Sequence, residues 1–132
     1  MGALAIVWLA LPSLALVSTG IALGLGWPRA HLEGTARGRL AVIAALGLAE
    51  LAPWAFALAA PSAVLQTHEA RTDFVVETGM VVACAAMLGT LALARALEPS
   101  PRRRALGWLV AHALFLATYL TDVGRAGVGQ IL

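Results

Sequence analysis

Charged residues and cysteines are scarce in this chain of 132 residues. Only 12% of the residues are charged, against about 25% in an ordinary soluble domain, whereas 61% are hydrophobic. Lysine is absent, all nine basic residues are arginines, and there is a single cysteine. One cysteine excludes a disulfide framework or a zinc cluster, and the apolar composition excludes a disordered or nucleic-acid-wrapping chain. The composition is that of a protein that lies in a lipid bilayer.

Four apolar runs are long enough to cross the hydrocarbon core of a bilayer, which takes about 20 helical residues. They cover residues 3–27, 40–60, 74–96 and 105–123. Only helices and closed barrels satisfy backbone groups in lipid, and continuous runs of this length exclude barrel strands. The sequence therefore predicts an all-α fold, a four-helix transmembrane bundle that forms one domain over residues 1–132. The first run has no basic segment before it, which favours a retained helix over a signal peptide.

The arginines are unevenly distributed over the predicted loops. Seven lie in or beside the first and third loops, and the other two lie in the second loop and the C-terminal tail: Arg29, Arg37, Arg39, Arg95, Arg102, Arg103 and Arg104, then Arg71 and Arg125. The positive-inside rule places the first and third loops in the cytoplasm and both termini on the periplasmic or outer side. We therefore expect a multi-pass protein of a bacterial inner membrane. The cluster Arg102–Arg104 is expected to bind anionic lipid headgroups.

Prolines and small residues predict where the helices bend, end and meet. Pro12 and Pro53 lie inside predicted spans and should kink them, whereas the Pro99–Pro101 segment should mark a helix stop. Thr72 or Asp73 is expected to cap the start of the third helix. Small residues at close helical spacing indicate faces that pack against protein: Ser13, Gly20 and Gly24; Ala85 and Gly89; Gly107 and Ala111.

Two ionisable residues, Glu50 and His112, are predicted to lie at nearly the same depth near the middle of the bilayer. The depth follows from a rise of about 1.5 Å per residue, counted from Arg39 and Arg104 at the nearer boundary. Each such residue costs roughly 2.5–3.5 kcal/mol at the centre of a spanning helix. A hydrogen bond between Glu50 and His112 would offset this cost. The pair is expected either to hold helices together or to contact a ligand, a cofactor or a proton.

Two further acids, Glu77 and Asp122, are predicted to lie close to the outer interface. Glu77 follows Asp73 by one helical turn, and Asp122 is at the end of the last apolar run. At this depth the two acids can reach water or pair with Arg71 and Arg125.

Two of the predicted helices carry a polar or polarisable stripe. At about 100° per residue, each of two sets of five residues shares a narrow arc: Trp108, His112, Phe115, Tyr119 and Asp122; and Asp73, Glu77, Met80, Cys84 and Met87. Such stripes should face the bundle interior or a partner protein rather than lipid. Because Met87 is at a suitable depth, a b-type haem held by His112 and Met87, or shared across a dimer, is one arrangement that the stripes allow.

The chain has no Gly-rich phosphate loop, no CxxC and no HExxH motif, so neither an enzyme nor a metal site is expected. Short loops and polar or small-residue faces on all four helices favour a non-catalytic accessory or structural subunit of a larger inner-membrane complex, such as a respiratory or electron-transfer complex. Its partners would be lipids, other transmembrane subunits or copies of itself, and no nucleic acid. The alternatives are a small transporter or channel protomer with a Glu50–His112 proton or ion path, and a haem- or quinone-binding membrane protein.

Overall fold

The computed structural model describes residues 2–26 and 34–132, and all regular secondary structure in these residues is α-helical. The helices are α1 (Gly2–Gly26), α2 (Gly34–Ala49), α3 (Ala52–Ala59), α4 (His68–Ala94), α5 (Pro99–Leu120) and α6 (Asp122–Ile131). The predicted all-α class is confirmed.

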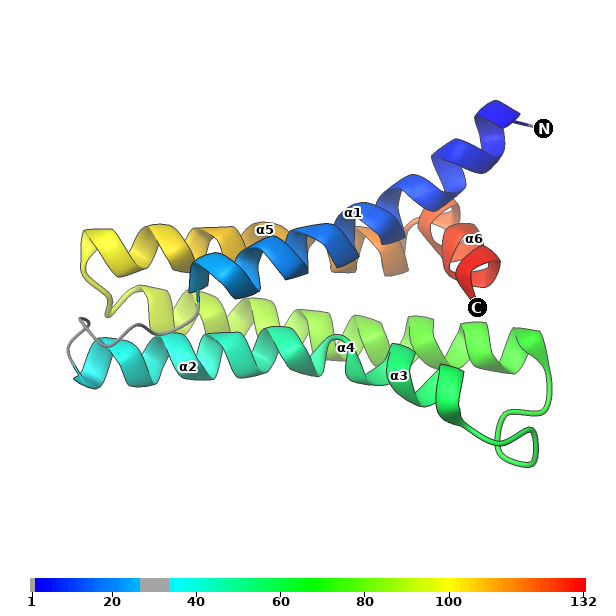
Figure 1. The fold of residues 1–132 in the computed structure, drawn as a ribbon, viewed down its shortest axis with the longest axis horizontal. Helices are drawn as coiled ribbons and strands as arrows, with labels where there is room; N and C mark the ends of the chain where they lie inside the picture. Colours follow the sequence, from blue (N-terminus) through cyan, green and yellow to red (C-terminus); the bar gives the residue numbers. More distant parts are fainter. Residues whose placement is uncertain (1, 27–33) are drawn as a thin grey trace.

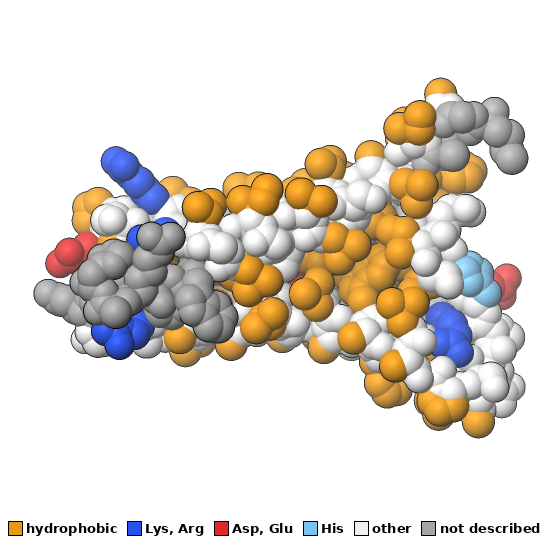
Figure 2. Space-filling view, viewed as in Figure 1, with side chains coloured by type: hydrophobic (Ala, Val, Ile, Leu, Met, Phe, Trp, Pro, Cys, Tyr) orange, Lys and Arg blue, Asp and Glu red, His pale blue; other side chains and the backbone are white. Residues whose placement is uncertain are grey.

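Three helical segments are long and apolar enough to cross a membrane: Ile6–Leu25, Gly34–Ala59 and His68–Ala94. The helices α5 and α6 provide a fourth only if they count as one span that is bent by 93°. On the face shown in Figure 2, the charged side chains gather toward the two ends of the molecule, and the middle is largely hydrophobic or uncharged. These are the features of a multi-pass membrane protein.

The long helices lie side by side in two layers, with α1 and α5 in one and α2, α3 and α4 in the other (Figure 1). The packing joins α1 to α5, α5 to α4, and α2 to both α4 and α5. The short helix α6 turns back against α1 at the end of the molecule that also holds the α3–α4 loop. At this end no Cα atom in the described part of α1 lies within 8 Å of one in α3.

The second predicted span is broken in its middle, between α2 and α3. Pro53 has no backbone N–H to donate to the carbonyl of Ala49, and its ring crowds the preceding turn. The backbone tightens just before it, where the amides of Glu50 and Leu51 donate to the carbonyls three residues earlier, at 3.2 and 3.1 Å. The kink expected at Pro53 is therefore a two-residue break in the helix that places Glu50 in the turn, while Gly34–Ala59 remains one spanning segment.

Two other helix ends differ from the predicted ones. The helix α4 begins at His68 and is capped by Thr67, whose hydroxyl accepts from the amide of Ala70 at 3.0 Å, so the caps expected at Thr72 or Asp73 are wrong. The Pro99–Pro101 segment lies in the first turn of α5, where a missing N–H costs nothing. The first turn of each helix is polar, so the start of the apolar run does not indicate where the helix begins.

The last predicted helix also ends early, because α5 stops at Leu120 and the chain turns into α6. Thr121 caps the new helix by accepting from the amide of Gly124 at 3.1 Å.

Arginine side chains satisfy backbone carbonyls at helix ends. Four of them donate in this way: Arg39 to Ala96, Arg71 to Ala57 and Ala60, Arg102 to Leu97, and Arg125 to Tyr119. The last carbonyls of a helix have no partner within it, and leaving them unpaired is costly where water is excluded. A guanidinium has five N–H donors and suits this task.

The expected pairing of Arg71 and Arg125 with Glu77 and Asp122 is not present. Both acids are exposed, and neither forms an ion pair within the described part of the chain. The two arginines instead donate hydrogen bonds to backbone carbonyls at the ends of α3 and α5.

Close packing between helices depends on one expected glycine and on others that were not expected. Of the expected ones, Gly89 lies against α2, since a Cβ built on it would be 2.8 Å from Leu46 Cδ1. A Cβ built on Gly79 would be 2.4 Å from the ring of Tyr119, so α4 and α5 can approach only because this side chain is missing. In contrast, Gly20, Gly24 and Gly107 have nothing within 4 Å of the same position. The first two form a face of α1 that is open in the single chain.

Candidate functional site

The interior of the bundle holds one acid and one base. Glu50 is 1% exposed and His112 is 0% exposed, and Tyr119 is the other buried titratable side chain among the described residues. Glu50 lies in the turn between α2 and α3, and His112 lies on the buried face of α5. The two residues are at the same level of the bundle, as the sequence predicted.

These two side chains and Thr90 form a continuous hydrogen-bonded chain across three helical segments, which we call the relay. His112 Nδ1 is 2.8 Å from Glu50 Oε2, and His112 Nε2 is 2.9 Å from Thr90 Oγ1 on α4. The predicted hydrogen bond between Glu50 and His112 is confirmed. Thr90 was not predicted as part of the site, although it continues the small-residue face of α4 through Ala83 and Ala86.

The relay is held in place by apolar packing. The ring of Trp108 stacks on that of His112, with ring centroids 5.9 Å apart and planes at 22°. A Cβ built on Gly47 would be 1.9 Å from Trp108, so the indole can lie against α2 only because this side chain is missing. Trp108 is fully buried, and it lies one helical turn before His112, so its indole packs along the imidazole.

The relay is compatible with two protonation states that differ by one proton. In the first state, a neutral His112 donates from Nδ1 to the Glu50 carboxylate, and its Nε2 accepts from the Thr90 hydroxyl. In the second state, an imidazolium donates to both neighbours, and the Thr90 hydroxyl accepts. A hydroxyl can donate or accept after rotating its hydrogen, so the change needs no movement of the heavy atoms.

One oxygen of Glu50 and one nitrogen of Trp108 are buried without a partner. Within the described residues, these atoms are Glu50 Oε1 and Trp108 Nε1, and Arg104 Nη1 is a third buried atom without a hydrogen-bond partner. An unpaired buried polar atom costs about 1–3 kcal/mol, and native proteins keep few of them. Glu50 Oε1 therefore has unused capacity to accept a hydrogen bond or a proton.

A second buried pair lies at the other side of the turn in α2–α3. Trp54 Nε1 donates to the hydroxyl of Tyr119 at 2.8 Å, and both side chains are buried. Phe115 stacks on Tyr119 with centroids 6.1 Å apart. Tyr119 thus faces the interior as expected, but its hydroxyl bonds to Trp54, which sequence reasoning missed, and not to the relay.

The predicted stripe of α5 is interior only as far as Tyr119. Trp108, His112, Phe115 and Tyr119 are all fully buried, whereas Asp122 is exposed. Since α5 ends at Leu120, Asp122 belongs to the first turn of α6 and no longer shares the helical angle of the other four.

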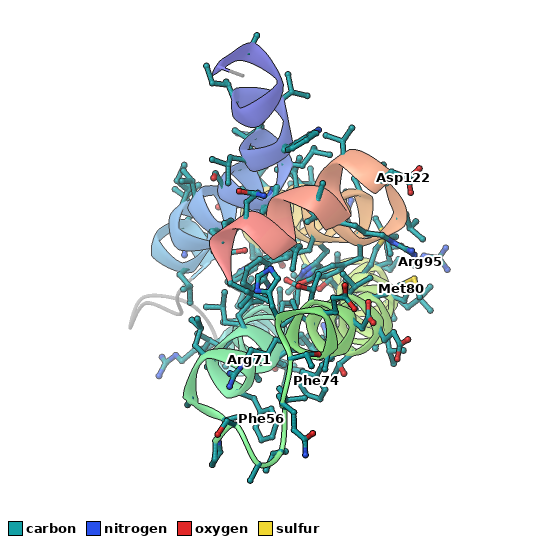
Figure 3. The ribbon with its side chains drawn as sticks, turned by 90° about the vertical axis from the view of Figure 1, so that its right-hand side faces the viewer. Phe56, Arg71, Phe74, Met80, Arg95 and Asp122 are labelled. Atoms are coloured by element: carbon teal, nitrogen blue, oxygen red, sulfur yellow. The ribbon has the colours of Figure 1, made fainter. Side chains whose placement is uncertain are left out.

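Most of the predicted stripe of α4 does not face the interior, although Met80 packs against the core. Asp73, Glu77 and Cys84 are exposed, and Met80 and Met87 are half-buried (Met80 is labelled in Figure 3). The buried face of α4 instead consists largely of small residues and valines: Val75, Val76, Gly79, Ala83, Ala86, Thr90 and Ala94.

His112 does not fit the expected role of a haem ligand. An axial histidine needs a free ring nitrogen for iron, and both ring nitrogens of His112 are engaged by Glu50 and Thr90. No hydrogen bond or ring contact joins Met87 to His112 in the described residues. Those residues also contain no group of three or more metal-ligating side chains.

Two clefts lie on the surface at opposite ends of the molecule. The cleft between α4 and α5 has a volume of about 300 Å³ and is lined by Leu91, Ala94, Arg95, Arg102, Leu106 and Leu109. The cleft between α4 and α6 has a volume of about 340 Å³ and is lined by His68, Glu69, Thr72, Asp73, Arg125, Ala126 and Gly129. Of the cluster expected to bind lipid headgroups, Arg102 lines a cleft, and Arg103 and Arg104 line neither.

Comparison with known proteins adds no assignment. No protein-family model, curated protein or solved structure matches the chain.

Proposed function

We propose that the chain is a four-span inner-membrane protein and the protomer of a small proton-coupled transporter or channel, with the relay as its proton-binding element. The observation that carries this proposal is the buried hydrogen-bonded chain from Glu50 through His112 to Thr90. Ionisable side chains inside a membrane bundle are rare and mark proton and ion pathways. In this topology the first and third loops are cytoplasmic and both termini are periplasmic.

The break between α2 and α3 supports this proposal. Transporters commonly bind substrates and coupling ions near the bilayer midplane, at helices that are interrupted there. Glu50 lies at such an interruption and has one unpaired oxygen. An interrupted helix also supplies a place where small backbone movements change the surroundings of a carboxylate.

The energetics also favour a functional role over a purely structural one. Hydrogen bonds between membrane helices contribute on average only about 0.6 kcal/mol. Replacing a buried ion pair with apolar residues of similar volume is often neutral or stabilising. Stability alone therefore gives little reason to bury an acid and a base in this bundle.

Proton flux into liposomes tests the proposal. Purified protein is reconstituted with a trapped pH-sensitive dye, and a potassium diffusion potential drives protons inward. We expect flux above that of empty liposomes, loss of flux in Glu50→Gln and His112→Ala, and retention in Thr90→Ser but not in Thr90→Val. Glu77→Gln is the matched control, because Glu77 is an exposed acid outside the relay. Equal flux in the wild type, Glu50→Gln and His112→Ala would refute the proposal.

A second candidate function, a non-catalytic subunit of a larger inner-membrane complex such as an electron-transfer complex, is favoured by the outward face of α4. Glu77 and Cys84 point out of the bundle along a helix that is apolar enough to span a membrane. A charged side chain in this position is expected to face protein or a water-filled region rather than lipid. The open Gly20 and Gly24 face of α1 offers another surface for close helix contact.

Labelling of the single cysteine tests this second function. A membrane-permeant maleimide is applied to native membranes and to the purified protein in detergent. If a subunit covers α4, Cys84 is protected in the membrane and reacts after purification. A cysteine introduced at Val110, an exposed position of α5, in a Cys84→Ser background reports the effect of lipid alone. Equal protection at both positions would argue against a covering subunit.

A further inference from the structure

The cleft between α4 and α5 joins an apolar floor to two arginines. Its lining combines the side chains of Leu91, Leu106 and Leu109 with those of Arg95 and Arg102. Leu91 is 43% exposed and Leu106 is 52% exposed, so the apolar part of the cleft is continuous with the outer surface of the bundle. A molecule in this cleft would therefore meet both the hydrophobic exterior and two cations.

The two arginines differ in how they are held. Arg102 donates from Nη2 to the carbonyl of Leu97 at 2.8 Å, which fixes its guanidinium beside the α4–α5 loop and leaves further N–H donors. Arg95 caps the C-terminus of α4 and is exposed, and it projects away from the bundle (Figure 3). One guanidinium is thus fixed, and the other is available to move toward a ligand.

We infer that this cleft is a binding site for one anionic phospholipid, with the phosphate between Arg95 and Arg102 and an acyl chain along Leu91, Leu106 and Leu109. Guanidinium groups recognise phosphate through charge and paired N–H donors. The leucines lie on the bundle side of the arginines along both α4 and α5, which is the order in which a lipid presents headgroup and tail.

The charges in the lining select an anion. No acidic side chain lines this cleft, and Glu98 in the adjoining loop is outside it. The cleft at the opposite end has a basic and an acidic lining together, with Arg125 beside Glu69 and Asp73. Of these two clefts, the α4–α5 cleft is the one that combines uncompensated positive charge with an apolar floor. This site is independent of the relay and of the proposed proton flux.

The site also divides the arginine cluster in an unexpected way. Arg103 and Arg104 are adjacent to Arg102 in sequence, but they do not line the cleft. They provide a control that removes the same charge from the same end of the molecule. General attraction to an anionic surface would depend equally on all of these arginines.

Native mass spectrometry of the detergent-purified protein tests the site. The probes are phosphatidylglycerol and phosphatidylcholine with identical acyl chains, with and without excess inorganic phosphate. We expect one phosphatidylglycerol to bind in preference to phosphatidylcholine, and inorganic phosphate to leave the complex intact. Arg95→Gln and Arg102→Gln should each lower the binding about fivefold, and the Arg103→Gln/Arg104→Gln variant should lower it less than twofold.

A variant of the apolar floor separates lipid binding from charge alone. Leu106→Asn retains both arginines and should weaken retention of phosphatidylglycerol, with an unchanged helical circular dichroism spectrum. Three results would overturn the inference: equal binding of the two lipids, displacement by inorganic phosphate, or equal losses in the cleft and control arginine variants.

Discussion

Gly47 of α2 lies directly against the indole of Trp108 of α5. A Cβ at this glycine would be 1.9 Å from Trp108 Cζ3, which is far inside any possible contact distance. Trp108 also stacks on His112 of the relay. The absence of one side chain on α2 therefore sets the position of a histidine on α5.

Gly47→Ala should therefore destabilise the protein and disturb the relay. The indole cannot withdraw without losing its packing, so we expect a cost of about 1–3 kcal/mol, as for other overpacked cores. Unfolding in mild detergent, followed by circular dichroism, measures the change. Gly107→Ala is the matched control, since nothing lies within 4 Å of its added methyl group and alanine is the better helix former. Equal effects at the two glycines would contradict the packing described here.

Glu50 and His112 should be energetically coupled. In Glu50→Ala the ring of His112 loses the partner of Nδ1, and in His112→Ala both Glu50 and Thr90 lose theirs. We expect each single variant to be destabilised by about 1–3 kcal/mol and the double variant by less than the sum. The double-mutant cycle is measured by denaturant unfolding in detergent. Additive losses would show that the 2.8 Å contact contributes no interaction energy.

The hydrogen bond from Trp54 to Tyr119 should also contribute to stability. Trp54→Phe removes the indole donor, and Tyr119→Phe removes the acceptor while keeping the ring that packs on Gly79. We expect Tyr119→Phe to cost about 0.5–1.5 kcal/mol, because it also leaves Trp54 Nε1 buried without a partner. In the Trp54→Phe background, the same change should cost almost nothing. A similar cost in both backgrounds would assign the loss to something other than this bond.

The common depth of Glu50 and His112 could be predicted because counting residues along a helix measures distance along the membrane normal. The depth counted in this way changes by no more than one helical turn when the loop bounds shift or when the helix breaks between α2 and α3. The Thr90 contact could not be found in the same way, since it depends on which face of α4 meets α5. The small residues Gly79, Ala83 and Ala86 mark that face and were the available signal.

Glu77, Cys84 and Met87 share one side of α4, but this shared helical angle does not determine whether that side faces the bundle interior or a partner protein. A stripe that avoids lipid can face the interior or a partner, and the helical angle is the same in both cases. The buried face of α4 is decided by how closely a neighbour can approach, which small residues permit. The prediction that Asp122 belongs to the interior stripe of α5 was wrong for a different reason. Thr121 is a strong N-cap residue, and it marks the start of a new helix within the apolar run.

The interruption at Pro53 should be necessary for the proton-binding role proposed for the relay. In Pro53→Ala the new N–H can donate to the carbonyl of Ala49, so that α2 and α3 can join into one helix and turn Glu50 away from His112. We expect equal or higher thermal stability in detergent and loss of proton flux in liposomes, with the His112 imidazole NMR signals shifted by the loss of Glu50. Pro12→Ala is the control, because α1 is already a continuous helix through Pro12. Unchanged flux in Pro53→Ala together with shifted His112 signals would separate the relay from transport.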